Sequence, residues 1–482
     1  MTDQYTQNAG AAKHDVLDSH VVQELREICG GDNVIVYDPK RLKRYGRDQV
    51  SYDTQARPPA AAVLPDTPEQ VEAIVRLAHR HRIPITPRGA GSGLSGGAVP
   101  IHGGIVLSVE RMNRILEVDE QNLVAVVEPG VVTNDLDEAL KESGLFFAGY
   151  PMSDEFCYIG GNVAENAGGG RAVKYGVTGR YVLGVEVVLP DGERIQVGGK
   201  RYKDVTGYDL LSLLVGSEGT LGIFTRIYLR LLPRPTERAT VLSFFPSVDA
   251  AVDAIPRIVR DSGIVPTSVE FVDQLPLHKA CEMLGETLPY QNAHAMLLLE
   301  ADGRDAVVVQ REAETMEEIC RTSGASYVHR ANDDADAERL WTIRKQVPWA
   351  LRKYAQQQSL EDIALPPAAL PDYIAELQML ASKYDVTIPS FGHAADGNLH
   401  ATPLKRAAQT AEEWQETSGA LLAEMYEQAA RLGGTISGEH GIGHKRREYL
   451  PRVMSTRQID LFRGIKNTFD PDHIMNPGKI VE

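Results

Sequence analysis

Pro87-Arg-Gly-Ala-Gly-Ser-Gly-Leu-Ser-Gly-Gly97 is the densest glycine cluster in this chain of 482 residues. Three of its glycines match the GxGxxG pattern, but a Rossmann fingerprint must open a helix, with an acidic residue about 20 positions later. Pro100 and Gly103-Gly104 make a long helix here implausible, because proline and glycine disfavour helix interiors. The run is therefore weak evidence for NAD. Its unobstructed backbone N–H groups predict instead a concavity for a pyrophosphate, where Arg88 adds charge or shapes the loop.

Two further glycine-rich segments have the same character. Gly160-Gly-Asn-Val-Ala-Glu-Asn-Ala-Gly-Gly-Gly170 has a bare backbone that a large planar ligand could approach closely. Leu214-Val-Gly-Ser-Glu-Gly-Thr-Leu-Gly-Ile223 runs into a β-rich segment. A single glycine loop is more often a turn than a phosphate site. Three such loops are hard to explain as turns alone, because glycine costs unfolded-state entropy.

Short strands surround these loops. A helix is predicted over 20–29, and Thr67-Pro-Glu-Gln70 opens another with an N-cap and a proline at the first helical position. The predicted strands cover 83–87, 105–109, 115–118, 123–128, 181–189, 194–197 and 221–231. The region is therefore predicted to be α+β, with strands outnumbering helices.

Pro233-Arg-Pro235 marks a predicted domain boundary. Beyond it a strand–helix–strand unit occurs twice, which is compatible with a ferredoxin-like cap. These units cover 240–245, 248–262 and 265–272, then 295–300, 306–322 and 326–330, and later helices cover 338–354, 411–432 and 456–469. The predicted divisions are a disordered leader (1–17), a glycine-loop domain (18–235), a cap or substrate domain (236–436) and a C-terminal segment that completes the site (437–482).

Phe391-Gly-His-Ala-Ala-Asp-Gly-Asn-Leu-His-Ala401 carries a histidine on either side of a turn signal. Asp396-Gly397 favours a two-residue hairpin turn, because both residues tolerate positive φ. Counting outward pairs His393 with His400, and directly opposed residues have Cβ atoms roughly 4.5–5.5 Å apart. The pair therefore predicts two metal ligands. The alternative is a hairpin whose histidines are only buried and hydrogen-bonded.

Ser437-Gly-Glu-His-Gly-Ile-Gly-His444 adds a carboxylate and two imidazoles in a glycine-rich loop. Glu439 can complete a His/His/Glu set with an open coordination position, as in catalytic metal sites. His440 would lie beside the metal and is a candidate general base. The alternative, a helix N-terminus with solvated polar residues, leaves this chemistry unused. Together the two segments favour a divalent metal, with zinc or manganese expected and iron also compatible with mixed N/O ligation.

The composition argues against several classes of protein. Hydrophobic residues make up 43% and charged residues 24%, which is ordinary for a globular protein. A net charge of −16 argues against a nucleic-acid or anionic-membrane surface. The four cysteines are scattered without a CxxC pair, which excludes a disulfide scaffold and an iron–sulfur cluster built from this chain alone. No secretory signal or membrane-spanning apolar run is recognised, so the expected location is cytoplasmic, with a position peripheral to the membrane through a partner as the alternative.

The order and spacing of these motifs resemble the FAD-dependent 2-hydroxy-acid dehydrogenases of the vanillyl-alcohol-oxidase/PCMH flavoprotein superfamily. Within it, the likeness is to the D-lactate dehydrogenase and glycolate oxidase catalytic-subunit group. It extends from about Tyr45 to Ile480 and rests on the segments quoted above and on Asn476-Pro-Gly-Lys479. The resemblance implies an α+β protein in which a PCMH-type FAD-binding domain is joined by the cap and a C-terminal helical segment.

The resemblance also implies the roles of individual residues. FAD would be bound non-covalently, with the first loop on the pyrophosphate. The implied cofactor-binding residues are Arg88, Gly89, Ala90, Gly91, Ser92, Gly93, Leu94, Gly160, Gly161, Asn162, Asn166, Gly168, Glu218, Gly219, Gly222, Ile223 and Asn476. His393, His400 and Glu439 would bind the metal. His440 would be the catalytic base, and Arg344 would clamp the substrate carboxylate; without the likeness Arg344 is a solvated helix residue.

The implied reaction is oxidation of a 2-hydroxy acid by metal-assisted proton abstraction and hydride transfer to flavin N5. Electrons would pass to an external acceptor, either quinone-linked, an electron-transfer protein or oxygen. The alternatives are a D-2-hydroxyglutarate dehydrogenase, an FAD-carrying electron-transfer subunit of a larger complex, an NADPH-dependent flavin reductase and a flavin-dependent ether-lipid synthase. Lys345, Arg352 and Lys353 are candidates for a second substrate carboxylate. The enantiomer, and the choice between a homodimer and a complex with other subunits, stay open.

Overall fold

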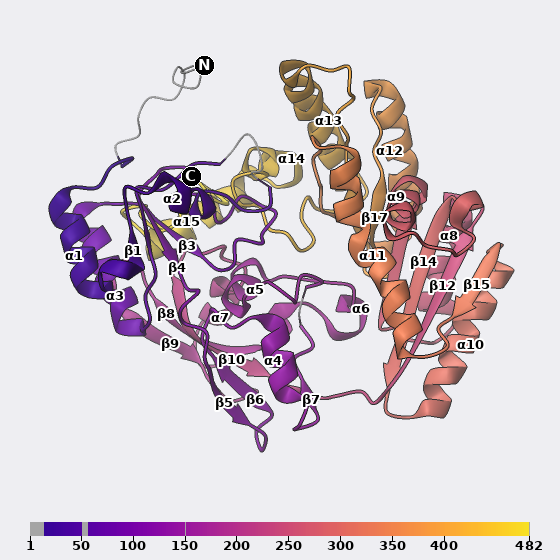
Figure 1. The fold of residues 1–482 in the computed structure, drawn as a ribbon, viewed down its shortest axis with the longest axis horizontal. Helices are drawn as coiled ribbons and strands as arrows, with labels where there is room; N and C mark the ends of the chain where they lie inside the picture. The colour runs from indigo at the N-terminus through magenta and orange to yellow at the C-terminus, as the bar shows by residue number, and fades with distance from the viewer. Residues whose placement is uncertain (1–13, 51–55, 150, 482) are drawn as a thin grey trace.

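The computed structural model describes residues 14–50, 56–149 and 151–481 (Figure 1). The leader predicted over 1–17 therefore lies mostly outside the described residues. Two halves lie side by side in Figure 1, with the earlier residues (indigo to magenta) on the left and a larger sheet of later residues (orange) on the right. The yellow C-terminal segment crosses back to the left half.

The left half contains two main sheets. One has the strand order β1-β2-β4-β3, with β2, β4 and β3 parallel, and the other is antiparallel with the order β5-β6-β10-β8-β9. The strands are β1 (Val34–Ile35), β2 (Ala61–Val63), β3 (Ile85–Arg88), β4 (Ile105–Ser108), β5 (Ile115–Asp119), β6 (Val124–Val127), β8 (Val182–Val188), β9 (Arg194–Gly198) and β10 (Ile223–Arg230). Short β7 (Leu145–Phe146) pairs with β11 (Leu232–Pro233). Each strand predicted in this region is present, with ends that differ by at most a few residues.

The helices of this half are α1 (Ser19–Cys29), α2 (Pro39–Tyr45), α3 (Pro68–His81), α4 (Thr133–Leu140), α5 (Ile159–Glu165), α6 (Ala172–Tyr175) and α7 (Leu210–Leu214). Helix α3 begins as predicted, because the Thr67 side chain accepts a hydrogen bond from the Gln70 backbone N–H. Residues 89–104 contain no helix, as the argument against a Rossmann motif requires. The second glycine segment differs from a plain loop, because α5 occupies its first part and ends at Asn166, which has a φ of 52°.

The right half is built on one seven-stranded sheet with the order β15-β12-β14-β13-β17-β18-β16. Its strands are β12 (Glu237–Phe245), β13 (Ser268–Asp273), β14 (Ala295–Gly303), β15 (Tyr327–Arg330), β16 (Ile363–Ala364), β17 (Ser390–His393) and β18 (Asn398–Ala401). Numbered along the chain, the first four strands lie in the order 4-1-3-2, which together with α8 (Val248–Pro256) and α10 (Ala306–Thr322) gives the predicted ferredoxin-like unit.

Both faces of this sheet are covered. Val241 and Leu297 pack in the core beneath α8, α10, α12 (Leu370–Tyr384) and α13 (Ala411–Arg431). The adjacent residues Leu242 and Leu298 point the other way, into the core beneath α9 (Gln274–Leu284) and α11 (Asp334–Tyr354). The polar side chains that the sheet carries among these apolar residues are therefore buried.

The histidine hairpin has a different register from the predicted one. His393 pairs with Asn398 and His400 pairs with Phe391, so the predicted direct pairing of the two histidines is wrong. The turn spans residues 394–397, because β17 must also pair with β13 and β18 with β16. These sheet neighbours fix the register, and a local turn signal cannot reveal them. The error is two residues, so both histidines still lie on one face of the sheet.

The C-terminal segment contains α14 (Leu450–Val453) and α15 (Thr456–Phe469), after which the tail packs on the left half. The Asn476 Nδ2 donates hydrogen bonds to the carbonyl oxygens of Gly97 (3.0 Å) and Glu218 (2.8 Å). Lys479 Nζ donates to the carbonyl oxygen of Val99 (2.7 Å). The tail therefore joins the first and third glycine loops.

Candidate active site

A cavity of about 420 Å³ lies between the two halves. One wall is formed by the three glycine loops and contains fifteen of the predicted cofactor-binding residues: Arg88, Gly89, Ala90, Gly91, Ser92, Gly93, Leu94, Gly160, Gly161, Asn162, Gly168, Glu218, Gly219, Gly222 and Ile223. The opposite wall contains Arg344, His393, His400, Glu439 and His440. The predicted cofactor loops and the predicted catalytic residues thus face a single space.

The first two loops approach each other closely at glycine positions. A Cβ at Gly89 would lie 3.6 Å from the Cα of Gly161, and a Cβ at Gly161 would meet nothing within 4 Å. Gly91 has a φ of 72°, and a Cβ there would overlap the Arg88 guanidinium. Arg88 is buried and donates to the carbonyl oxygen of Arg47 (2.7 Å), so it shapes the loop from beneath. A bare backbone cradle of this kind fits a ligand that needs close approach to backbone N–H groups.

Two predicted cofactor-binding residues, Asn166 and Asn476, are not part of the cavity lining. The Asn166 Oδ1 accepts a hydrogen bond from the Gly179 backbone N–H (2.8 Å), and Asn476 joins two loops as described above. Asn162 does line the cavity, but its Nδ2 donates to the Thr133 hydroxyl (2.8 Å). These side chains hold the loops in shape.

Glu218 and Glu165 form a buried carboxyl pair in the loop wall. Glu218 accepts hydrogen bonds from the backbone N–H groups of Ile442 (2.7 Å) and Gly443 (2.6 Å), so the third glycine loop holds the C-terminal loop. Burial raises the pKa of Glu218 to about 7 against the opposing effect of these two donors. Burial and the neighbouring Glu218 raise the pKa of Glu165 well above its ordinary value. Glu165 was not predicted as a site residue.

Three imidazoles converge on one carboxylate oxygen. The Oε1 of Glu439 lies 3.7 Å from Nε2 of His393, 3.2 Å from Nε2 of His400 and 3.5 Å from Nε2 of His440. The His400 and His440 rings are stacked, with centroids 4.9 Å apart and planes within 2°. The predicted set of His393, His400 and Glu439 is therefore brought together, with His440 beside it.

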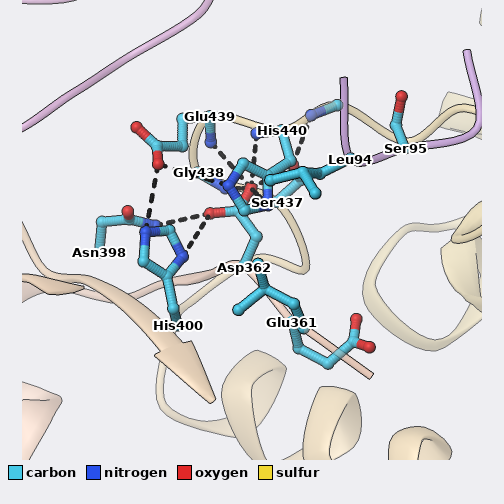
Figure 2. Close-up of polar contacts among 12 residues, drawn as sticks. Leu94, Ser95, Glu361, Asp362, Asn398, His400, Ser437, Gly438, Glu439 and His440 are labelled. Atoms are coloured by element: carbon cyan, nitrogen blue, oxygen red, sulfur yellow. Dashed lines mark hydrogen bonds and ion pairs between the residues drawn. The ribbon is translucent and has the colours of Figure 1, made fainter. Parts of the chain in front are cut away.

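The far side of each ring faces another buried carboxylate. His393 Nδ1 is 2.7 Å from Oε1 of Glu270, on the opposed position of the neighbouring strand. His400 Nδ1 and His440 Nδ1 are 3.8 Å and 3.9 Å from the Asp362 carboxylate, and Figure 2 marks the contact with His400 as a dashed line. A carboxylate behind a ring nitrogen is the usual support of a histidine that uses its other nitrogen as a ligand.

Glu270 also holds the predicted substrate arginine. Arg344 Nε donates to Oε2 of Glu270 (2.7 Å), and the Arg344 guanidinium carbon lies 5.0 Å from the centre of the Phe391 ring. Arg344 is only 2% exposed, so it is not the solvated helix residue of the alternative interpretation. One carboxylate therefore orients both Arg344 and His393.

Burial and charge act against each other at these groups. Burial by itself would raise the pKa of Glu270, but His393 and Arg344 outweigh it and lower the pKa to about 2. Burial disfavours the His393 imidazolium, but Glu270 and Glu439 raise the pKa of His393 well above its usual value. Burial lowers the pKa of His400, against the opposing influence of Glu439.

The donor set fits a divalent cation. Ligands about 2.0–2.2 Å from a tetrahedral zinc ion lie about 3.3–3.5 Å from one another. The three Nε2–Oε1 separations of 3.2–3.7 Å are close to this value, although most exceed a good hydrogen-bond length. A second grouping, without His393, is formed by Asp362, His400, Glu439 and His440, whose ligand atoms lie within 4.8 Å of one another. Asp362 is the least suited of these four residues to bind a cation, because its oxygens already accept five hydrogen bonds.

Sequence reasoning missed Glu270 and Asp362. Glu270 lies between apolar residues in the middle of strand β13, and Asp362 follows Glu361 just before the buried strand β16. An acidic residue inside an apolar strand is costly unless it is paired, so each was a detectable signal. Cys157 also lines the cavity, where burial raises the pKa of its thiol. A thiol of raised pKa is a poor nucleophile.

Among the three candidates for a second carboxylate, Lys345 and Arg352 line the cavity, and Lys353 is outside the lining. Arg352 donates to Gln49 across the two halves, at 3.1 Å to the side-chain oxygen and 3.0 Å to the carbonyl oxygen. Within the described ranges, the helices are all too short or too polar to cross a membrane.

Comparison with known proteins identifies both halves. A family model described as "FAD linked oxidases, C-terminal domain" matches residues 234–480, and one described as "FAD binding domain" matches residues 59–198. The chain is 40% identical to the glycolate oxidase subunit GlcD of Bacillus subtilis, covering 95% of this chain and 96% of that protein. It is 37% identical to a D-lactate dehydrogenase of Archaeoglobus fulgidus, covering 93% and 97%.

Among solved structures, p-cresol methylhydroxylase with substrate bound has a similar fold, with a TM-score of 0.80 at 19% identity over 96% of both chains. The predicted α+β fold with a PCMH-type FAD-binding domain is confirmed by this likeness and by the family match. The chain belongs to the FAD-linked oxidase family, as an oxidoreductase related to glycolate oxidase and D-lactate dehydrogenase.

Proposed function

We propose that this enzyme oxidises a small 2-hydroxy acid, of the D-lactate or glycolate type, to the 2-oxo acid. The observation that carries the proposal is the shared cavity, in which glycine loops face a cluster of three histidines, a glutamate and a buried arginine. The names of the two relatives, a glycolate oxidase subunit and a D-lactate dehydrogenase, support the same substrate class. FAD would lie along the loop wall without a covalent link, since Cys157 is not an activated nucleophile.

His393, His400 and Glu439 are the proposed ligands of a divalent metal, zinc or manganese. Their geometry supports this, and so does the Glu270 carboxylate behind His393, which leaves Nε2 to face the cation. When bound, the metal would act as a Lewis acid toward the substrate oxygen, and FAD would supply the hydride acceptor.

His440 is the proposed acceptor of the substrate hydroxyl proton, and stacking on His400 holds its ring in one orientation. Arg344 is proposed to bind the substrate carboxylate. Its Nε is taken by Glu270, and no described residue makes a hydrogen bond with its two terminal nitrogens, so these can form a bidentate pair with a carboxylate.

An external acceptor, quinone-linked or a protein, is proposed to receive the electrons. The word "subunit" in the name of the glycolate oxidase relative favours assembly with other chains. The expected cytoplasmic location remains a proposal based on composition.

Anaerobic mixing of the FAD-loaded protein with a panel of 2-hydroxy acid enantiomers tests the function directly. Glycolate or a D-2-hydroxy acid is expected to bleach the flavin absorbance, and NADPH is not. Bleaching by NADPH alone would indicate a flavin reductase. An unchanged spectrum with every compound would indicate an FAD carrier.

Two variants separate the proposed roles. His440→Asn should keep FAD and metal but slow bleaching by about 10²–10⁴-fold, the usual contribution of a general base. His400→Ala should lower metal content and activity together. Activity lost at full metal occupancy would remove His400 from the ligand set.

A further inference from the structure

The Asp362 side chain is enclosed by consecutive donors of the 437–440 segment. Its Oδ2 accepts hydrogen bonds from the Ser437 hydroxyl (2.7 Å) and from the backbone N–H groups of Gly438 (3.0 Å), Glu439 (2.9 Å) and His440 (2.7 Å). Figure 2 shows these contacts converging on the carboxylate. Successive N–H groups of this kind form an anion-binding nest, and here the anion is a side chain of the protein itself.

The other oxygen connects this nest to the histidine hairpin. Asp362 Oδ1 accepts from Asn398 Nδ2 (2.8 Å), at the start of the strand that carries His400. Asp362 also forms a bridge with Ser437 and directly precedes β16, which pairs with β18. The backbone of Glu439 and His440 is therefore fixed relative to His400 through one fully buried side chain.

The same carboxylate faces two rings. His400 Nδ1 is 3.8 Å from Oδ1 and His440 Nδ1 is 3.9 Å from Oδ2. Both nitrogens are buried, and neither has a hydrogen-bond partner among the described residues. Each ring thus lies between Asp362 on its Nδ1 side and Glu439 on its Nε2 side, so a negative charge at Asp362 favours a proton on Nδ1 whenever Nε2 is engaged.

We propose that Asp362 is a positioning residue that serves a metal ligand and the proton acceptor at once. It holds Glu439 and His440 through their backbone and orients the His400 and His440 rings through its own negative charge. The proposal rests on the proposed function for the identity of the ligands and of the base. It adds a residue that touches neither substrate nor metal, but whose loss should impair both roles.

The test compares Asp362→Asn with Glu361→Gln in the FAD-loaded protein. Glu361 is the matched control because it is an adjacent, fully buried carboxylate. Its partners are Lys445, Arg446, Ser359 and Tyr426, and Figure 2 shows it pointing away from both rings. The readouts are zinc affinity by chelator competition, the absorption spectrum of the cobalt-substituted protein, and kcat at saturating zinc.

Asp362→Asn should weaken zinc binding by about 10–100-fold, alter the cobalt spectrum and lower kcat at saturating zinc by at least about tenfold. Glu361→Gln should lower thermal stability but keep zinc affinity within about twofold of the wild-type value. Ser437→Ala removes one of the four donors to Oδ2, and should give a smaller loss of the same kind. It serves as the test if Asp362→Asn does not fold.

The outcomes distinguish this inference from the proposed function. Wild-type zinc affinity and kcat in Asp362→Asn would overturn the role of Asp362 and leave the proposed function standing. Equal losses in Glu361→Gln would also overturn it, because any buried charge would then have the same effect. If the wild-type protein binds neither zinc nor manganese, the metal proposal fails, and Asp362 is judged on kcat alone. If no hydroxy acid is oxidised, the role of Asp362 is judged on zinc affinity and the cobalt spectrum.

Discussion

At the scale of single residues, Glu270 connects the two side chains that are proposed to act at opposite ends of the substrate. Its two oxygens hold His393 and Arg344, which are expected to act on the hydroxyl end and the carboxylate end. Glu270→Gln should therefore lower zinc affinity by about 10–100-fold and raise the substrate KM in the same variant. Breaking this buried pair should also cost about 3–5 kcal/mol of unfolding free energy. Metal titration, steady-state kinetics and chemical denaturation measure the three effects.

Glu300→Gln is the control for that prediction. Glu300 is equally buried on the neighbouring strand β14, where it accepts from the Trp341 indole N–H (2.8 Å). The Glu300→Gln variant should have a lower unfolding free energy and unchanged KM and zinc affinity. If KM changes equally in both variants, Glu270 has no specific role.

Substitutions at two glycines of the second loop should separate effects on FAD binding from effects on metal binding. A Cβ at Gly168 would lie 3.1 Å from both Cβ and Oε2 of Glu439, whereas one at Gly161 would meet no protein atom within 4 Å. Gly168→Ala should displace Glu439 and weaken zinc binding about tenfold. Gly161→Ala should weaken FAD binding and keep zinc affinity. Fluorescence titration of FAD and chelator competition for zinc measure both, and the reverse pattern would contradict the arrangement.

At the scale of secondary-structure elements, Asp273 at the end of β13 makes the free energy of unfolding depend on pH. Burial raises the pKa of Asp273 to about 7, although its Oδ2 accepts from the Ser390 backbone N–H (2.6 Å). The unfolded value is about 3.9, so the native state binds this proton more tightly between about pH 4 and 7. The stability it contributes is complete below about pH 4 and is lost as the pH rises through 7.

Asp273→Asn removes that dependence. The melting temperature of the variant relative to wild type should rise between pH 5 and pH 8, which scanning calorimetry at the two values measures. A constant difference between the two curves would show that Asp273 does not titrate in this window.

The elements also show how far sequence reasoning extends. Periodicity and turn residues predicted most strands and the longer helices except α9 and α12, because these signals are local. The sequence also placed His393, His400, Glu439 and His440 in one site, although the hairpin register was two residues off. Sheet neighbours far along the chain set that register. The roles of Glu270 and Asp362 were missed for the same reason, since Arg344 and His440, which they hold, lie more than seventy residues away from them.

At the scale of the whole molecule, Asn476 links the tail to two glycine loops. Asn476→Gly tolerates the φ of 43° and removes both hydrogen bonds. It should lower the unfolding free energy by about 1–3 kcal/mol and weaken FAD binding, because two buried carbonyl groups lose their donor. Denaturation and FAD titration measure these effects. His473→Gly, at an exposed position of the same tail with a φ of 53°, should change neither.

The return of the tail to the first loops has a consequence for biosynthesis. Gly97 leaves the ribosome long before Lys445 and Asn476, yet the loop that contains it accepts hydrogen bonds from both later residues, at the carbonyl oxygens of Ser95 and Gly97. A nascent chain therefore cannot form these links between its glycine loops until Asn476 has been added. A chain that stops before Asn476 would lack both hydrogen bonds that join the first and third loops, and is expected to bind FAD more weakly.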